Sequence, residues 1–266
     1  MDTFKEKYGP WALITGASRG IGAEFARQCA GRGLNLILIA TNEQLLQQQK
    51  DLIEKMHGVE VSTVALDLAG EDILSLLGKA TQGCEIGLLV LNAGISSVKP
   101  FFKQDQAELL RQFYVNARAA LMLTRHYGEP MQKRKRGGII LLSSASALYG
   151  TAYSANYAGT KAYNLILGES LWYELKKEGV DVLGFMPGCT RTPGFDKHNP
   201  NPGAFVPVMG VEETVADALK ALGRRPSRIA GWMNRLSYFL VGMLFSRRMA
   251  INAVSGSMGK IFRPLE

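Results

Sequence analysis

Two residues within the segment 155–178 have the types and spacing that proton transfer requires. Tyr157 and Lys161 are four residues apart, so their side chains share one face if the segment is a helix. A phenol has an ordinary pKa of about 10 and is a poor base at neutral pH, but a nearby ammonium group favours its phenolate form. Most tyrosines on amphipathic helices serve packing and most lysines are solvated. The pair therefore becomes meaningful only through the motifs that accompany it.

A glycine-rich stretch near the N-terminus could bind phosphate. It reads Thr15-Gly16-Ala17-Ser18-Arg19-Gly20-Ile21-Gly22 and lies between an apolar run and a segment with helical spacing. Glycines allow the backbone to approach a pyrophosphate closely, and the N-terminus of a helix offers unpaired N–H groups and a positive dipole end. A tight turn between a strand and a helix is the alternative explanation for this stretch.

Apolar runs and amphipathic segments alternate along the chain and predict the elements that would position these residues. This β-α-β-α order predicts a parallel sheet with helices on both faces, which is a doubly wound, Rossmann-type α/β fold of about seven strands. The expected strands are Trp11–Thr15, Leu34–Ala40, Val59–Leu66, Ile86–Leu91, Gly138–Ser143 and Val180–Met186, and the expected helices lie near 20–32, 43–57, 71–81, 105–128, 155–178 and 211–222.

The pattern changes after the sixth strand. A proline-rich loop over about 188–210 is long enough to act as a lid over a substrate. The segment 224–266 holds eight basic residues and one acid, so it carries +7 of the net charge of +8 and leaves residues 1–223 close to neutral. We therefore expect a dinucleotide-binding and catalytic domain over 1–223 and a basic helical tail over 224–266. The neutral body argues against nucleic-acid binding.

Further motifs occur in a fixed order. They are Asn92-Ala93-Gly94 after the fourth run, Asn116 in the next helix, Ser144 after the fifth run, Tyr157 and Lys161 as Y-x-x-x-K, and Pro187-Gly188 with Thr192 after the sixth run. Together with G-x-x-x-G-x-G, they resemble the short-chain dehydrogenase/reductase family, of the NADP type and similar to its steroid dehydrogenases and carbonyl reductases. The resemblance covers roughly residues 11–222. It implies an oxidoreductase that acts on CH–OH and C=O groups with a nicotinamide cofactor.

The end of the second strand bears on the choice between NAD and NADP. An acid there would bind the ribose 2′-hydroxyl, whereas its absence with an arginine nearby admits a 2′-phosphate. Ala40 stands at this place, and Arg19 lies in the glycine loop, where family members that use NADP often have a basic residue. Many family members have an arginine in place of Thr41, so this chain departs from the pattern. We expect NADP(H), with Arg19 as the charged partner of the phosphate.

The resemblance implies a larger cofactor-binding set and no metal. Asp67 corresponds to a family residue near the adenine, with a helix N-cap as the alternative. The full set is Gly16, Ser18, Arg19, Gly20, Ile21, Gly22, Ala40, Thr41, Asn42, Asp67, Leu68, Asn92, Ala93, Gly94, Tyr157, Lys161, Pro187, Gly188, Thr190 and Thr192.

The catalytic roles also follow from the resemblance. Ser144, 13 residues before Tyr157, would hydrogen-bond the substrate oxygen. Tyr157 would exchange the proton, and Lys161 would favour its phenolate and bond the nicotinamide ribose. Asn116 would hold a water in a proton relay to Lys161, with a helix-interior Asn bonded to nearby backbone as the alternative.

The residues expected around the substrate are apolar with scattered hydroxyls. They include Ser146, Tyr149, Tyr153 and Cys189, which suits a small lipophilic ketone, aldehyde or secondary alcohol. The alternative function is an NADP(H)-binding redox sensor or scaffold with little turnover. Such proteins usually lose the tyrosine or the lysine, and this chain has both.

Three alternatives remain for the apolar run around 232–249 in the basic tail. It packs over the substrate site or against a partner subunit, it lies on an anionic membrane surface, or it continues the core. The family implies a homodimer or homotetramer through the helices near 105–128 and 155–178. Three widely spaced cysteines and a polar N-terminus favour a cytoplasmic protein, peripheral to a membrane if the second alternative holds.

Overall fold

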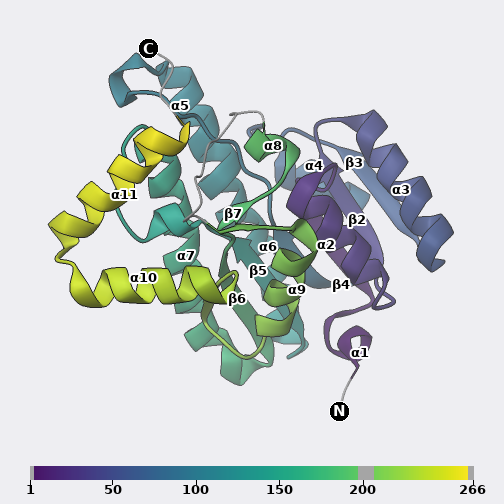
Figure 1. The fold of residues 1–266 in the computed structure, drawn as a ribbon. Coiled ribbons are helices and arrows are strands. Elements are labelled where there is room, and N and C mark those ends of the chain that lie inside the picture. Colours follow the sequence, from purple (N-terminus) through teal and green to yellow (C-terminus); the bar gives the residue numbers. More distant parts are fainter. Residues whose placement is uncertain (1–2, 197–206, 263–266) are drawn as a thin grey trace.

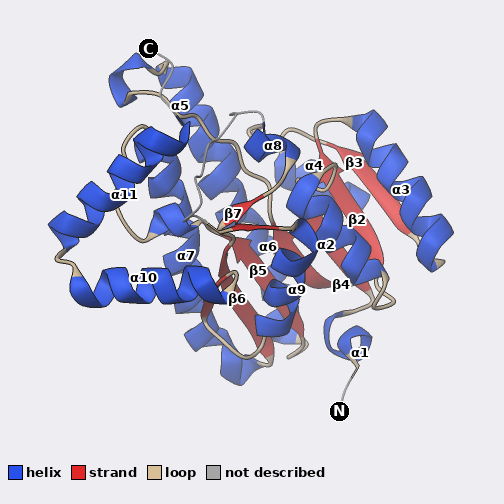
Figure 2. Cartoon of the chain, in the orientation of Figure 1, coloured by secondary structure: helices blue, strands red, loops and turns tan. Residues whose placement is uncertain are grey.

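The apolar runs form the parallel strands of a central sheet in the computed structural model, which describes residues 3–196 and 207–262. Within these residues the main sheet has seven strands in the order β3-β2-β1-β4-β5-β6-β9 (Figures 1 and 2). The doubly wound, Rossmann-type α/β prediction is confirmed. The strands are β1 (Trp11–Thr15), β2 (Asn35–Ala40), β3 (Val61–Ala65), β4 (Ile86–Leu91), β5 (Gly137–Leu142), β6 (Val180–Met186) and β9 (Ser227–Ile229).

The last strand of the sheet was not predicted. Ser227–Ile229 pairs with Gly184–Met186 of β6, and it lies beyond residue 223, in the segment that we expected to be tail. Three residues are too few to show a strand pattern, so only the free edge of β6 identifies this segment as a strand.

Helices cover both faces of the sheet. The side chains of each strand alternate between two cores, so Ala12 and Ile14 of β1 pack on one face while Leu13 packs on the other. The first face is covered by α2 (Gly20–Ala30), α3 (Glu43–His57) and α9 (Val211–Ala221), and the second by α4 (Ile73–Ala80), α6 (Ala119–Lys133) and α7 (Ala155–Leu175).

The order of the strands fixes where a ligand can bind. The chain moves outward from β1 to β2 and β3 and then returns to β4 on the other side of β1. In open parallel sheets, the crevice outside the carboxyl ends of the strands at such a reversal binds the ligand. The glycine loop follows β1, Asn92 follows β4 and Ser143 follows β5, so these motifs meet at one edge of the sheet.

The C-terminal part forms two helices beside α7. These are α10 (Trp232–Leu244) and α11 (Arg247–Phe262), which project from the sheet on the side opposite α3 (Figure 1). Over residues 3–196 and 207–262, no helix is long and apolar enough to cross a membrane. The smaller elements are α1 (Phe4–Tyr8), α5 (Gln106–Phe113), α8 (Pro193–Asp196) and the paired strands β7 (Cys189–Thr190) and β8 (Val208–Met209).

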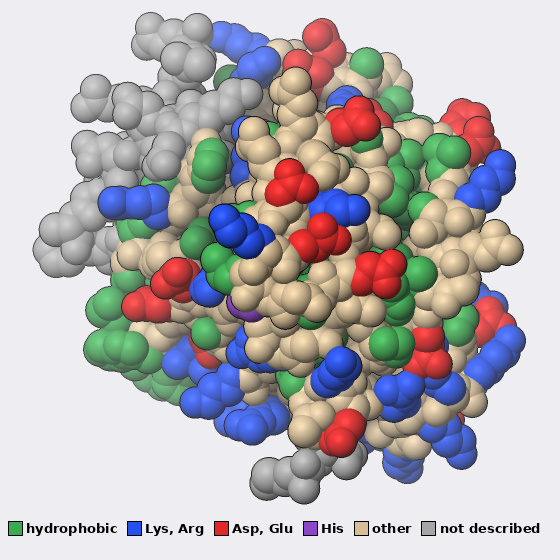
Figure 3. Space-filling model, turned by 90° about the vertical axis from the view of Figure 1, so that its right-hand side faces the viewer, with side chains coloured by type: hydrophobic (Ala, Val, Ile, Leu, Met, Phe, Trp, Pro, Cys, Tyr) green, Lys and Arg blue, Asp and Glu red, His purple; other side chains and the backbone are tan. Residues whose placement is uncertain are grey.

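Two expected segments are only partly described. Residues 197–206 of the loop predicted over 188–210 lie outside the described residues, as do residues 263–266 of the tail. On the face that Figure 3 shows, basic and acidic side chains are interspersed among neutral ones.

Candidate active site

The glycine loop is shaped by contacts in which a side chain would not fit. Gly16 has φ +66°, and a Cβ there would lie 2.8 Å from Asn92 Nδ2 and 2.9 Å from Ala93 Cα. The Asn92 amide donates to the carbonyl oxygens of Thr15 (2.9 Å) and Gly16 (3.1 Å). Asn92 therefore holds the loop in shape, and the open backbone at the start of α2 suits a pyrophosphate.

Lys161 lies inside the protein at the end of β5. It is 4% exposed, and its Nζ donates to the carbonyl oxygen of Leu142 at 2.8 Å. Ser143 Oγ donates to the backbone oxygen of Lys161 at 2.7 Å, which ties α7 to the strand end. Burial lowers the pKa of Lys161 to about 8, because a buried ammonium loses its hydration.

Tyr157 stands one turn before Lys161, half-buried, with Lys161 Nζ 5.8 Å from the centre of its ring. Burial raises the pKa of Tyr157 above its ordinary value, and a hydrogen bond with Ser144 acts in the opposite direction. We expected Lys161 to favour the phenolate, yet in this structure loss of hydration is the larger effect. The phenol is therefore protonated at neutral pH.

Asn116 belongs to a π-helical segment, Tyr114–Arg118, between α5 and α6. Single turns of this kind are frequent at functional sites. Its Oδ1 accepts from Ile95 N (2.8 Å), and its Nδ2 donates to Ile95 O (2.9 Å) and Thr160 Oγ1 (3.1 Å). The side chain thus joins the loop after β4 to α7, and the water relay to Lys161 stays a prediction.

Asn164 was missed in the sequence, although it lies on the face of α7 that carries Tyr157 and Lys161. Its Nδ2 donates to the carbonyl oxygens of Asn116 (2.9 Å) and Leu142 (3.3 Å). It is 1% exposed, and its Oδ1 has no hydrogen-bond partner among the described residues. The available signal was a polar residue one turn after the lysine on a face that must be buried.

Comparison with known proteins decides the family. The model for short chain dehydrogenases matches residues 10–203. This chain belongs to the short-chain dehydrogenase family.

Relatives of this short-chain dehydrogenase extend over the tail as well. A 7β-hydroxysteroid dehydrogenase of Clostridium sardiniense is 30% identical over 97% of this chain and 98% of its own length. A very-long-chain 3-oxoacyl-CoA reductase-like protein of Arabidopsis thaliana is 33% identical over 90% of this chain and 78% of its own.

Two solved structures also match most of the length of this chain. The structure of a 7β-hydroxysteroid dehydrogenase has a TM-score of 0.90 at 26% identity and covers 95% of this chain and 99% of its own. A short-chain dehydrogenase from Sphingobium yanoikuyae in complex with NADPH has a TM-score of 0.76 at 27% identity, with 88% of this chain and 94% of its own covered.

The place where we expect the adenosine to bind contains Arg19, an exposed cation. Ala17 N donates to Ile39 O at 3.1 Å, which brings the glycine loop against the end of β2, and Arg19 next to it has no ion-pair partner among the described residues. Ser18 is half-buried and Thr41 exposed. The Asn42 side chain caps α3 by accepting from Leu45 N, so it is engaged in the fold.

Asp67 and Leu68 both make contacts within the protein in this structure. Asp67 accepts from Ala69 N at 3.0 Å and forms an ion pair with Arg111 at 2.7 Å, which together hold its pKa low against burial, the largest single influence. The N-cap alternative for Asp67 is wrong, because α4 begins after Asp72. Leu68 is buried in the core.

The segment after β6 contacts the glycine loop through Thr192. Thr192 lies beside Gly20, where a Cβ would come within 3.3 Å of it, and Thr192 Oγ1 accepts from Phe195 N. Thr190 points inward instead and bonds the oxygen of Gly188 at 3.2 Å. Of the two threonines, only Thr192 is therefore positioned next to the loop.

The four candidate substrate residues lie on two segments. Tyr153 has φ +64°, an uncommon conformation for such a residue, and Ser146 Oγ is buried without a partner among the described residues. Burial raises the pKa of Cys189, so its thiol is protonated and unreactive at neutral pH. The tail helices contact the segments of Tyr149 and Cys189, as expected if the tail packs over the substrate site.

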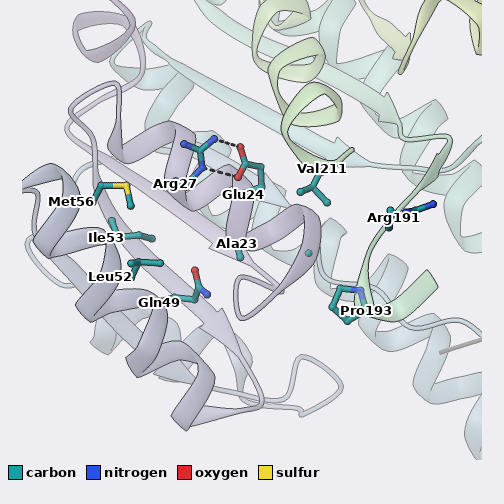
Figure 4. Close-up of a pocket in the computed structure, with 11 residues that line it drawn as sticks. Ala23, Glu24, Arg27, Gln49, Leu52, Ile53, Met56, Arg191, Pro193 and Val211 are labelled. Carbon is teal, nitrogen blue, oxygen red and sulfur yellow. Dashed lines mark hydrogen bonds and ion pairs between the residues drawn. The ribbon is translucent and has the colours of Figure 1, made fainter. Parts of the chain in front are cut away.

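A separate groove of about 290 Å³ lies on the outer side of α2 (Figure 4). It is lined by residues of α2 and α3 together with Arg191, Pro193 and Val211, and its lining includes none of the catalytic candidates. Its charged pair, Glu24 and Arg27, is joined by a 2.7 Å ion pair. We place neither cofactor nor substrate in it.

Proposed function

We propose that this chain is an NADP(H)-dependent oxidoreductase that transfers a hydride between nicotinamide and a lipophilic ketone or aldehyde, or its secondary alcohol. The observation that carries the proposal is the position of Tyr157, whose ring centre lies 5.8 Å from Nζ of the buried Lys161 at the end of β5. Carbonyl reduction needs a proton donor at the oxygen, and a phenol at this place can supply that proton.

The residues at the carboxyl edge of the sheet fit a nicotinamide dinucleotide. Glycines 16 and 22 leave the backbone open, and Gly94 leaves room beside Lys161 Nζ, since a Cβ there would stand 3.2 Å from it. The cofactor, when bound, supplies the hydride. Arg19 would bind the 2′-phosphate, and the absence of an acid at Ala40 favours NADP. The NADPH complex of the Sphingobium yanoikuyae relative supports this choice.

The protein's own part is to hold and move the proton. Ser144 and Tyr157 would both hydrogen-bond the substrate oxygen as negative charge develops on it, which stabilises the transition state. Tyr157 then gives up its proton, and Lys161 stabilises the phenolate that remains. Relatives named for steroid and very-long-chain acyl substrates support a lipophilic substrate.

Assembly with a second copy is part of the proposal. Large apolar side chains are exposed on the helices that the family uses for oligomers, among them Phe113, Tyr114, Tyr163, Ile166 and Tyr173. Contiguous apolar surface of this kind marks an interaction site. The outer face of α10 is a second such surface, which a partner subunit or an anionic membrane would cover.

NADPH oxidation with a panel of lipophilic ketones and aldehydes tests the reaction. We expect turnover with NADPH, weaker turnover with NADH, and a loss of about 10³-fold in the Tyr157→Phe variant, since a positioned general acid contributes roughly 10²–10⁴-fold. Tyr163→Phe, on the same helix but outward-facing, is the control. Cofactor binding without turnover of any substrate would favour the sensor or scaffold instead.

A further inference from the structure

One face of α10 is turned toward the candidate substrate residues. Asn234, Tyr238 and Gly242 are four residues apart and therefore lie in one line along the helix. At one end, Asn234 is 7% exposed and packs so closely on Gly188 that a side chain there would clash with it. At the other end, a Cβ on Gly242 would lie 3.4 Å from the Tyr149 hydroxyl. The inner face of α10 thus spans the distance from Gly188 to Tyr149.

Tyr238 occupies the middle of this face. It is half-buried, and burial, with Cys189 and Tyr149 nearby, raises its pKa to about 12. A phenol in such a place usually finds a hydrogen-bond partner. Among the described residues, however, neither the Tyr238 hydroxyl nor the Tyr149 hydroxyl is hydrogen-bonded to the protein.

The segment that carries Tyr149 is fixed between α11 and the catalytic candidates. Ser255 Oγ accepts from Ala152 N at 3.1 Å, and Ile251 lies against Gly150. The same segment joins Ser144 to Tyr157 in the sequence. The Tyr149 segment is therefore joined to Ser144 and Tyr157 through the chain and to the tail helices through these contacts.

We propose that Tyr149 and Tyr238 form a polar subsite that binds a second oxygen of the substrate, remote from the carbonyl that is reduced. The inference rests on the proposed function and narrows its substrate class to lipophilic carbonyl compounds that carry a distal hydroxyl or keto group. Each phenol can donate and accept a hydrogen bond. Because a phenol hydroxyl is a neutral hydrogen-bonding group, the subsite suits a neutral oxygen better than a carboxylate.

A pair of substrates that differ in one group tests the subsite. The probes are a steroid ketone with a hydroxyl on the ring farthest from the ketone and its deoxy analogue. We expect the wild-type enzyme to prefer the hydroxylated ketone in kcat/KM by about tenfold, which corresponds to one or two hydrogen bonds. Tyr238→Phe and Tyr149→Phe should each reduce this preference to about threefold or less, through KM, and leave the deoxy ketone unaffected.

Tyr127→Phe, a tyrosine on α6 hydrogen-bonded to Thr81, is the matched control and should retain the full preference. Equal use of both ketones by the wild-type enzyme, or an unchanged preference in both variants, would overturn the subsite. Calorimetric binding of the same ketones to the Tyr157→Phe variant with NADP⁺ separates the two proposals. If the wild-type enzyme turns over no ketone but the hydroxylated ketone still binds more tightly than its deoxy analogue, the proposed reaction is wrong and the subsite stands. If there is neither turnover nor a binding preference, both proposals are wrong.

Discussion

The two sides of the proposed substrate cleft are held in different ways. On one side, which we call the floor, Lys161, Asn164, Asn116 and Ser143 are all buried and joined to β5 and the loop after β4 by side-chain hydrogen bonds. On the other side lies the roof, formed by α10 and α11. Its described hydrogen bonds to the segment that carries Tyr149 both involve Ser255 Oγ, which accepts from Ala152 N and donates to Gly150 O.

The two sides also differ in the polar residues that they bury. Both α7 and α10 present large apolar side chains to solvent, but α7 buries Thr160, Lys161 and Asn164 against the sheet, whereas α10 buries Asn234. Proton transfer requires fixed distances, so a densely bonded floor suits the chemistry. Selection of a substrate tolerates movement, and regions with few buried contacts open at low free-energy cost. We infer that the floor performs the reaction and the roof selects the substrate.

Lys161→Met should give the largest effect on the floor, and it should change activity and stability in opposite directions. We expect turnover to fall by at least about 10²-fold, as expected for a group that acts in proton transfer. At pH 7 the variant should nevertheless be more stable, by up to about 3 kcal/mol, since a shift from an ordinary pKa of about 10.4 to about 8 costs roughly 1.4 kcal/mol per unit.

The sign of the pH dependence follows from linkage. Between pH 8 and about 10.5 the unfolded chain holds the Lys161 proton that the folded protein releases, so the wild-type protein gains stability as pH rises through this range. The advantage of Lys161→Met should therefore be largest at pH 7 and disappear near pH 10.5. Urea unfolding at both pH values measures it, with the exposed Lys177→Met as control. A stability advantage of Lys161→Met that does not change with pH would contradict the lowered pKa of a buried Lys161.

Asn164→Leu should give the next largest effect, because it removes two donors from the floor. Loss of the bonds to Asn116 and Leu142 should lower the free energy of unfolding by roughly 1–3 kcal/mol, and kcat should fall about tenfold as Asn116 and Lys161 lose their alignment. The pH profile of kcat should shift as well, because Lys161 Nζ bonds the same Leu142 oxygen.

A matched variant on the same helix distinguishes alignment from stability. Asn156 on α7 also donates two hydrogen bonds, to Leu109 and Gln112, so Asn156→Leu should lower stability but leave the pH profile unchanged. If both variants lose kcat in proportion to stability, with no shift in either profile, Asn164 has only a structural role.

More of the floor than of the roof could be predicted from the sequence. The doubly wound parallel sheet and the positions of Tyr157, Lys161 and the glycine loop along it follow from apolar periodicity and motif spacing, which are local signals. Asn164 was missed because a single buried amide belongs to no sequence motif. The carbonyl oxygens that accept its hydrogen bonds belong to residues 48 and 22 positions away. Tyr238 was missed because α10 is apolar on both sides, so the sequence did not show which face turns toward Tyr149.

Ser255→Ala should give the smallest effect and tests how weakly the roof is held. The variant loses two hydrogen bonds of Ser255 Oγ, one from Ala152 N and a longer, exposed one to Gly150 O, each worth at most roughly 0.5–1.5 kcal/mol, so global stability should change little. Because the roof opens locally, amide hydrogen exchange in α10 and α11 should become severalfold faster while exchange in α7 and β5 is unchanged. KM for the substrate should rise about two- to fivefold with kcat preserved. Ser257→Ala, on the same helix and bonded only within it, should change neither quantity. Faster exchange in α7 after Ser255→Ala would show that floor and roof open together, and the division between them would then be wrong.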